Sequence, residues 1–269
     1  MTAPDQFHFT AYPGLDGVHL VRSAGSVPTA ARHSHRSLCV GAVLSGERVL
    51  VLAGGDIRVA AGQVLVLAPG LVHACPDAGA SEAVVISVSA DQLDRLGFDA
   101  ACLGRVEPCL DDPDLFGCVT GLAGLAGGSV ASLERDGALQ ALLARLEERG
   151  RGRPDPEAGS GSRPAPVEAA VLHLTAHAGE EVRLDHLARL AGMSPCRLNR
   201  LFSHHIGMPP HEYQTLLRVQ AVKAAIGAGV GLAEAAAQAG FFDQSHMTRC
   251  FRKVVGMTPG QYARGVSRS

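Results

Sequence analysis

Residues 231–264 read GLAEAAAQAGFFDQSHMTRCFRKVVGMTPGQYAR, and an earlier part of the chain repeats the pattern of this stretch. The two copies are 48 residues apart up to the turn between their first two helices. After that turn, which is one residue longer in the second copy, they are 49 residues apart. The matched pairs are Val182 with Val230, Leu184 with Leu232, Ala188 with Ala236, Ala191 with Ala239, Gly192 with Gly240, Ser194 with Asp243, Arg200 with Arg249, Phe202 with Phe251, Gly207 with Gly256, Met208 with Met257, Pro210 with Pro259 and Tyr213 with Tyr262. So many matches in order indicate an internal duplication.

Each copy has apolar residues at helical spacing on both sides of a glycine-containing turn. Ser194 and Asp243 are good N-cap residues for the second helix of each copy, and Pro210 and Pro259 suit a first helical turn. The expected helices cover residues 167–178, 184–191, 195–204, 210–228, 232–239, 244–254 and 259–264. Helix, turn and capped helix form a helix-turn-helix, whose second helix enters the major groove of DNA.

Two copies on one chain resemble a dimer. The long helix at 210–228 would hold two recognition helices that reach successive major-groove faces, about 34 Å apart. In the second recognition helix Met247 and Phe251 should face the core, which leaves an outward set of Gln244, Ser245, His246 and Arg249. In the first, the inward set is Leu198, Leu201 and Phe202, and the outward set is Cys196, Arg197, Asn199 and Arg200.

The strings LARLAGMSPCRLNRLFSHHIGMPPHEYQTLLRVQAVKAAI (187–226) and AAAQAGFFDQSHMTRCFRKVVGMTPGQYAR (235–264) resemble the AraC family of bacterial transcription regulators. The resemblance covers about residues 167–264, and its most specific part is GF, a polar cap, SHMTRCFRK and MTP-x-QY in order. It implies base contacts by Cys196, Asn199, Arg200, Gln244, Ser245, His246 and Arg249. Paired hydrogen bonds from Arg to guanine, and from Asn or Gln to adenine, suit that role. Arg252 and Lys253 are expected to contact phosphates.

The chain has 269 residues, which suggests two domains, and a stretch rich in Gly, Ser and Pro separates them. RGRGRPDPEAGSGSRPAP at 149–166 has almost no apolar residue. We therefore expect a domain at 1–150, a flexible linker at 151–166 and the double helix-turn-helix domain at 167–269. Residues 1–164 hold 13 basic and 19 acidic residues, whereas residues 165–269 hold 11 and 7. The basic part is the part expected to bind nucleic acid.

Short runs of Val, Leu and Ile between residues 18 and 89 are separated by turn signals, which predicts an all-β barrel or sandwich. Trailing helices are expected at 91–96, 115–126 and 138–148. The last carries a leucine stripe of Leu139, Leu142, Leu143 and Leu146. This stripe would either pack on the barrel or pair with its copy in a homodimer.

HSHRSLC at 33–39 and PGLVH at 69–73 resemble the two motifs of a cupin barrel, the sensory fold common in this family. His33, His35 and Cys39 share strand parity and could all point inward, where His73 would join them. Three imidazoles and a thiolate would suit zinc, nickel or ferrous iron. A pocket for a small organic effector and a scaffold without ligand remain the alternatives for this domain.

We therefore expect a cupin-like barrel fused to a sequence-specific DNA-binding domain. Its expected partners are operator DNA, a small effector or metal ion, and a second copy of the chain in a homodimer. RNA polymerase would be a further partner if the protein activates transcription. A metal- or metabolite-binding scaffold with non-specific DNA affinity is the alternative. No phosphate loop, nucleophile elbow or HExxH occurs, so we expect no enzyme. The start lacks a secretory signal and no run of about 18 apolar residues exists, so we expect a cytoplasmic protein. The seven cysteines are odd in number, which favours thiols.

Overall fold

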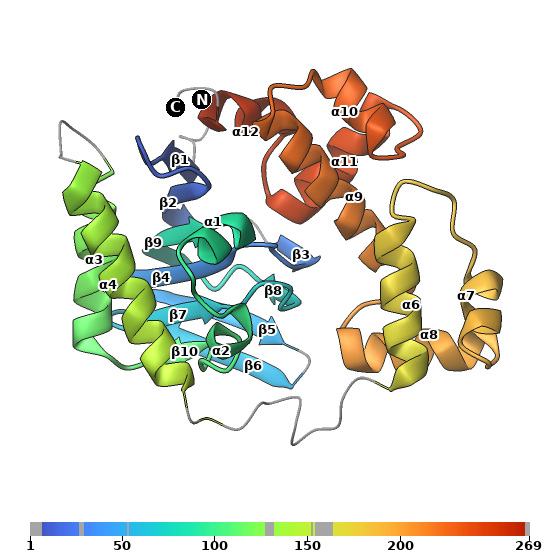
Figure 1. Cartoon of the computed structure of the whole chain (residues 1–269), viewed down its shortest axis with the longest axis horizontal. Coiled ribbons are helices and arrows are strands. Elements are labelled where there is room, and N and C mark those ends of the chain that lie inside the picture. Colours follow the sequence, from blue (N-terminus) through green and yellow to red (C-terminus); the bar gives the residue numbers. More distant parts are fainter. Residues whose placement is uncertain are drawn as a thin grey trace.

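Strands fill the N-terminal part of the chain and helices fill the C-terminal part in the computed structural model (Figure 1). The structure describes residues 7–26, 30–52, 54–126, 132–151, 153 and 164–266. The strands are β1 (Phe7–Ala11), β2 (Val18–Ser26), β3 (Ala30–His33), β4 (Leu38–Ser45), β5 (Glu47–Leu52), β6 (Gly55–Ala60), β7 (Val64–Leu67), β8 (His73–Cys75), β9 (Ala80–Val88) and β10 (Cys109–Leu110). The expected all-β region is confirmed, and it begins earlier than expected, at β1.

Two antiparallel sheets form the barrel, in the orders β1-β2-β9-β4-β7-β10 and β3-β8-β5-β6. Side chains of a strand alternate between its two faces. On β4, Leu38 and Val40 therefore face the trailing helices, whereas Cys39 and Val43 face the opposite sheet. Because both faces of this strand are covered, its first six residues are buried, which explains the nearly continuous apolar run in its sequence.

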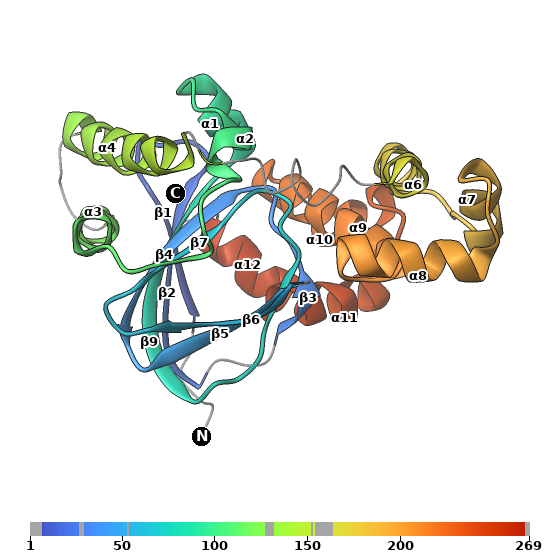
Figure 2. The same ribbon diagram turned by 90° about the horizontal axis from the view of Figure 1, so that it is seen from below.

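The trailing helices α1 (Ala90–Arg95), α2 (Ala100–Leu103), α3 (Pro113–Gly124) and α4 (Ser132–Gly150) cover one side of the barrel (Figure 2). The leucine stripe of α4 has no exposed surface and lies in the core with the six-stranded sheet. Of the two roles expected for this stripe, burial within its own domain is confirmed: α4 packs against α2 and α3, and α3 packs against β4 and β9 of the barrel. The other expected role, pairing of this stripe with its copy in a homodimer, is contradicted, because these four side chains are already covered by their own chain.

The C-terminal helices are α6 (Ala165–Ala176), α7 (Leu184–Leu190), α8 (Pro195–Ile206), α9 (Pro210–Gly227), α10 (Leu232–Gln238), α11 (Gln244–Val255) and α12 (Pro259–Val266). All seven expected helices are confirmed to within a few residues at their ends. Most of the expected linker, residues 152 and 154–163, lies outside the described residues. All seven cysteines are free thiols, as expected. Among the described helices, none is both long and apolar enough to span a bilayer.

The helical half contains two cores that correspond to the two sequence repeats. Phe202 and Leu198 lie in the first core, and Phe251 and Met247 lie in the second. The long helix α9 contributes Leu216 to the first core and other residues to the second, so it holds the repeats together. The two repeats start their recognition helices differently: the Asp243 side chain accepts a hydrogen bond from the His246 amide at 2.6 Å, whereas Ser194 makes no side-chain cap bond.

The two turn glycines provide a first prediction. Gly192 and Gly240 both have positive φ, at 65° and 75°, a conformation that costs an alanine about 1–2 kcal/mol. A Cβ at Gly192 would meet open space, whereas one at Gly240 would overlap the backbone carbonyl of Gly179. Gly192→Ala should therefore lower the free energy of unfolding by about 1–2 kcal/mol, and Gly240→Ala by roughly 1–3 kcal/mol more. Urea unfolding of both variants checks this, and equal losses would contradict the close packing at Gly240.

Candidate nucleic-acid interface and histidine cluster

The outward faces of α8 and α11 carry equivalent side chains on helices of equal length, 12 residues each. Arg200 and Arg249 are both exposed, one turn after exposed Cys196 and Ser245 respectively. Helix α8 ends at Gly207 and helix α11 ends at Gly256, and both glycines have left-handed backbone conformation. The outward faces of the two helices are therefore equivalent from their first turn to their last. Exposed arginines at the same place on two linked helices form a surface that can hydrogen-bond to two DNA sites.

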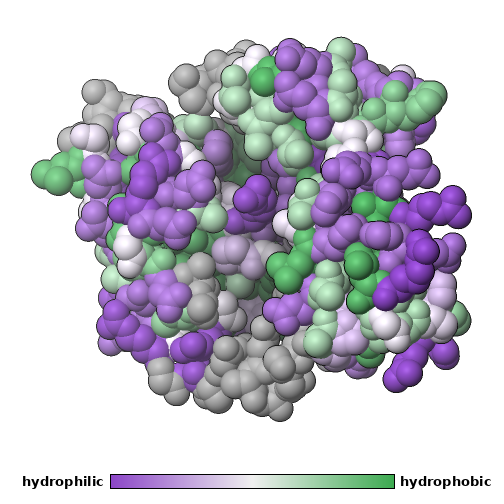
Figure 3. Space-filling model, turned by 45° about the vertical axis from the view of Figure 1, so that its right-hand side comes forward, coloured by the Kyte–Doolittle hydropathy of each residue, from purple (hydrophilic) through white to green (hydrophobic). Residues whose placement is uncertain are grey.

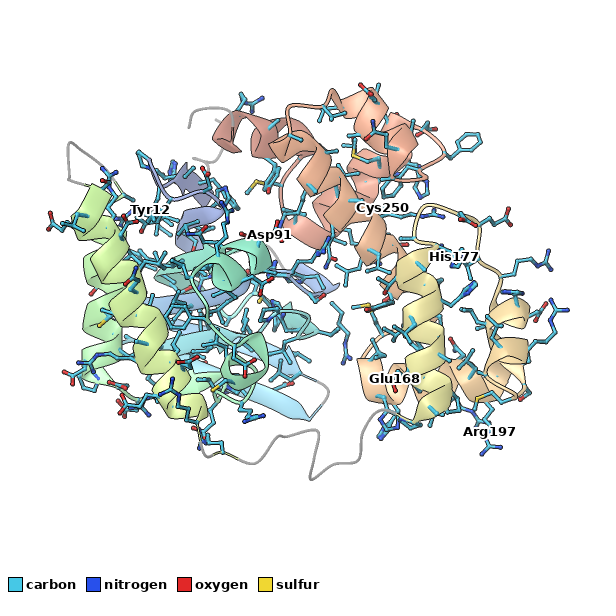
Figure 4. All side chains as sticks on the ribbon, in the orientation of Figure 1. Tyr12, Asp91, Glu168, His177, Arg197 and Cys250 are labelled. Atoms are coloured by element: carbon cyan, nitrogen blue, oxygen red, sulfur yellow. The ribbon has the colours of Figure 1, made fainter. Side chains whose placement is uncertain are left out.

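The other residues expected to contact DNA differ in how freely they project. Arg197, Gln244 and Arg252 are exposed, and Arg197 lies at the outer edge of the helical half (Figure 4). His246 is partly buried, with its ring edge-on to Phe241 at a centroid distance of 5.4 Å. Lys253 is exposed and lies 3.8 Å from Glu212 of α9. Asn199 is partly buried and lines a small hollow between α7 and α9. The contacts of these residues with DNA remain predictions.

Three of the four expected metal ligands come together on the four-stranded side of the barrel. His33 ends β3 and pairs directly with His73, the first residue of β8, while His35 lies in the short connection between β3 and β4. The potential ligand atoms of these three imidazoles all lie within 4.8 Å of one another. Their ring centroids are 4.3 to 5.2 Å apart. Strand pairing thus unites two motifs that are about 40 residues apart in the sequence.

The histidine cluster has the donor atoms that a transition metal needs. Nδ1 of His73 lies 3.0 Å from the carbonyl oxygen of Leu71, and a carbonyl only accepts, so Nδ1 carries the hydrogen and Nε2 keeps its lone pair. This is the outer hydrogen bond that orients metal-bound histidines. Burial lowers the pKa of His35 well below its ordinary value and also lowers the pKa of His73, which favours neutral imidazoles.

Cys39 is not part of this cluster, which corrects its expected role as the fourth ligand. Its strand, β4, belongs to the other sheet, where Cys39 pairs with Leu67 and Ser87. Strand parity does not bring Cys39 to the histidines, because the chain leaves β3 after His33 and enters a different sheet at Leu38, so alternation does not continue between them. Burial also raises the pKa of the Cys39 thiol, whereas a metal ligand must be the thiolate.

The two halves touch where α12 meets β1 and where α11 meets β3, and a further set of contacts, which sequence reasoning missed, lies beside the histidine cluster. The Arg32 guanidinium donates to the carbonyl of Gly207, at the end of α8. Nε2 of Gln220 on α9 lies 3.4 Å from the carbonyl oxygen of Ser34 and 3.5 Å from its hydroxyl. Val72 packs against the core of the first repeat. In Figure 3 a hollow separates the outer parts of the two halves on the face toward the viewer.

Lys223 of α9 is a second charged residue at this junction, besides Arg32, and it too was missed. It lies one turn along α9 from Gln220, which contacts Ser34 of the barrel, and burial together with the Lys223 charge lowers the pKa of His19. Its Nζ lies 5.5 Å from the ring centroid of Tyr262, and burial lowers its own pKa. One signal could have drawn attention to it: Lys223 is one of two lysines in a chain whose other basic side chains, apart from histidine, are arginines.

Comparison with known protein families supports both halves of this description. The model of an AraC-like ligand binding domain matches residues 20–143, and that of a helix-turn-helix domain matches residues 187–265, together about three quarters of the chain. The uncharacterized HTH-type transcriptional regulator YbfI of Bacillus subtilis (strain 168) is 28% identical over 239 residues, 86% of each chain. Regulatory protein ada of Salmonella typhimurium is 36% identical over 84 residues, 31% of this chain and 24% of that protein.

Solved structures share the arrangement of the whole chain. ToxT from Vibrio cholerae O395 covers 99% of this chain, with 100% of its own length, a TM-score of 0.56 and 11% identity. Wild-type ToxT of Vibrio cholerae strain SCE256, crystallised with an unsaturated fatty acid, covers 100% of this chain and 99% of that chain, with a TM-score of 0.54 and 10% identity. At this level of identity the likeness shows the two-domain fold alone.

Proposed function

Because this chain belongs to the AraC family of HTH-type transcriptional regulators, we propose that it recognises a specific operator with α8 and α11, under the control of a ligand bound by its barrel domain. The observation that carries the DNA-reading role is the equivalence of Arg200 and Arg249, exposed at the same position of two matched helices. Guanine is the base that arginine recognises best in the major groove.

Selection from a random DNA library, followed by footprinting, tests this function. We expect a defined site whose protected bases fall in two groups about one helical turn apart. Protection should persist at moderate salt, because base contacts add to the salt-dependent phosphate contacts. Binding that ignores sequence and disappears with salt would favour the alternative, a ligand-binding scaffold. Light scattering of the DNA complex would count the chains, and a homodimer would have to use a surface other than the leucine stripe of α4.

The ligand that the barrel is best equipped to bind is a divalent transition metal. Three imidazoles converge, two of them buried, and His73 is already oriented by the Leu71 carbonyl. When bound, zinc or nickel would provide a concentrated positive charge, and three protein nitrogens leave a coordination position for water or another ligand. A small organic effector is the other candidate, as an unsaturated fatty acid is the bound molecule in one ToxT structure.

His73→Ala tests the metal site. Loss of this ligand should weaken zinc or nickel binding by at least about 100-fold, because even outer hydrogen-bond partners of metal ligands affect affinity by about 10- to 100-fold. Equilibrium dialysis of full-length protein without a histidine tag, with metal analysis of the protein fraction, measures this. His8→Ala is the matched control, because His8 is exposed on β1 and does not belong to the cluster. Equal binding by wild type and His73→Ala would place the metal elsewhere.

A ligand can control DNA binding only if it binds two conformations of the protein unequally. The contacts of Arg32, Ser34 and Val72 with the helical half lie next to the histidines and provide a direct route for such control. Contact with RNA polymerase would follow only if the regulator activates. In vitro transcription from the selected site, with and without metal, distinguishes activation from repression.

A further inference from the structure

Every histidine of the cluster is adjacent in sequence to a residue that touches the helical half. Arg32 precedes His33, Ser34 lies between His33 and His35, and the residue before His73 is Val72. These neighbours contact the end of α8, the side chain of Gln220 on α9, and the core of the first repeat, respectively. A shift of any of the three imidazoles on ligand binding therefore moves a residue at the junction.

A positive charge from the helical half already stands beside the cluster. Lys223 lies on α9, one turn along from Gln220, whose Nε2 lies 3.4 Å from the carbonyl oxygen of Ser34, the residue between His33 and His35. Its ammonium packs over Tyr262, whose ring also contacts Phe9 of β1 at a centroid distance of 5.9 Å. Lys223 is therefore held at the junction by aromatic packing on α12 and by the docking of the two halves.

We propose that Lys223 makes metal binding at His33, His35 and His73 incompatible with the docked arrangement of the two halves, so that the bound ion drives α9 away from the barrel. This inference rests on the proposed metal-sensing function. Three neutral imidazoles leave the full charge of a divalent ion uncompensated, and like charges in a desolvated site repel strongly. Because coupling is reciprocal, an ion that is bound less tightly in the docked form shifts the population toward the undocked form.

Undocking would change how the two DNA-reading helices are held. In the docked form Arg32 holds the end of α8, while β3 lies against α11. Both recognition helices are thus tied to the barrel, at points about 50 residues apart in the chain. Because α8 and α11 both pack against α9, movement of α9 away from the barrel would break both ties, and metal binding would affect both half-sites of the operator at once.

Metal affinity of charge variants at position 223 is the first test. Lys223→Met keeps a long flexible side chain and removes the charge, so it should bind zinc or nickel about tenfold more tightly than wild type. Lys223→Arg keeps the charge and should bind like wild type. Equilibrium dialysis on the full chain measures all three. Equal affinity in the three proteins would overturn the proposed antagonism while leaving the metal site intact.

The chemical reactivity of the two lysines is the second test and reports docking directly. An amine-acetylating reagent at one fixed pH, followed by peptide mass spectrometry, compares Lys223 with Lys253, whose side chain is 65% exposed. Without metal, Lys223 should react several-fold more slowly than Lys253. With zinc its rate should rise toward that of Lys253, and in His73→Ala it should not change with zinc.

The outcomes separate this inference from the function on which it rests. If wild type, Lys223→Met and Lys223→Arg all fail to bind zinc and nickel, the metal-sensing proposal itself is wrong. If zinc binds to wild type and the acetylation rate of Lys223 stays the same or falls, the metal site stands and the release of α9 is wrong. Tighter binding in Lys223→Met together with a faster rate at Lys223 in wild type supports the whole proposal.

Discussion

The double variant Arg200→Ala with Arg249→Ala should lose sequence-specific DNA binding and keep its fold. Each arginine is exposed, so its truncation removes little packing. A paired arginine–guanine contact contributes about 1–3 kcal/mol to discrimination, so the loss of two should weaken operator binding by about 30-fold to about 10⁴-fold. Binding to unrelated DNA should change far less, because phosphate contacts carry that affinity.

Competition binding on the selected operator measures this loss, with circular dichroism to verify the fold. Arg95→Ala is the matched control, since Arg95 is an exposed arginine on α1 of the barrel half. The two single variants should each relax base preference in one half-site only. Unchanged operator affinity in the double variant would mean that the assigned faces of α8 and α11 do not read the bases.

Phe251→Ala should be among the most destabilising single changes in the helical half. Phe251 has no exposed surface, lies in the core of the second repeat and packs edge-on against Tyr262 at a centroid distance of 5.6 Å. Removing a fully buried phenylalanine side chain costs about 3–5 kcal/mol, because the cavity adds to the lost burial. That is a large part of the stability of a typical domain.

The matched control is Phe242→Ala, nine residues earlier in the chain. Phe242 is 92% exposed, so the same substitution there should change the free energy of unfolding by no more than about 0.5 kcal/mol. Thermal or urea unfolding of both variants compares them. If Phe242→Ala were as damaging as Phe251→Ala, the assignment of the inward face of α11 would be wrong, and with it the outward position of Arg249.

The helical half could be predicted closely because its signals are local. Each signal lies within about a dozen residues of sequence: the helical spacing of apolar residues, the N-cap Asp243 and the glycine after each first helix. The duplication repeats the helical spacing and the turn glycine in the other copy. The barrel was predictable as a class for a similar reason, because strand alternation and turn residues are also local. The pairing of its strands could not be predicted in the same way. Strand parity placed Cys39 with the histidines, and this was wrong because the chain passes from one sheet to the other between His33 and Cys39.

The role of the α4 leucine stripe shows the limit of periodicity. A stripe of four leucines indicates that one face of the helix is buried. It does not indicate by what, because the rest of the same domain or a helix of a second chain would bury that face equally well. The structure decides between them, because Leu139, Leu142, Leu143 and Leu146 are fully buried in the core that α4 shares with α3 and the six-stranded sheet.

The amino-acid sequence alone was enough to predict two helix-turn-helix units, a β-rich N-terminal domain and two histidine motifs. The pairing of His33 with His73, the separation of Cys39 from them and the contact of α9 with Ser34 became visible in the folded chain. The residues in these contacts are far apart along the chain. Contacts between Arg32 and Gly207, or between Ser34 and Gln220, join residues more than 170 positions apart, and such contacts leave no periodic pattern in the sequence.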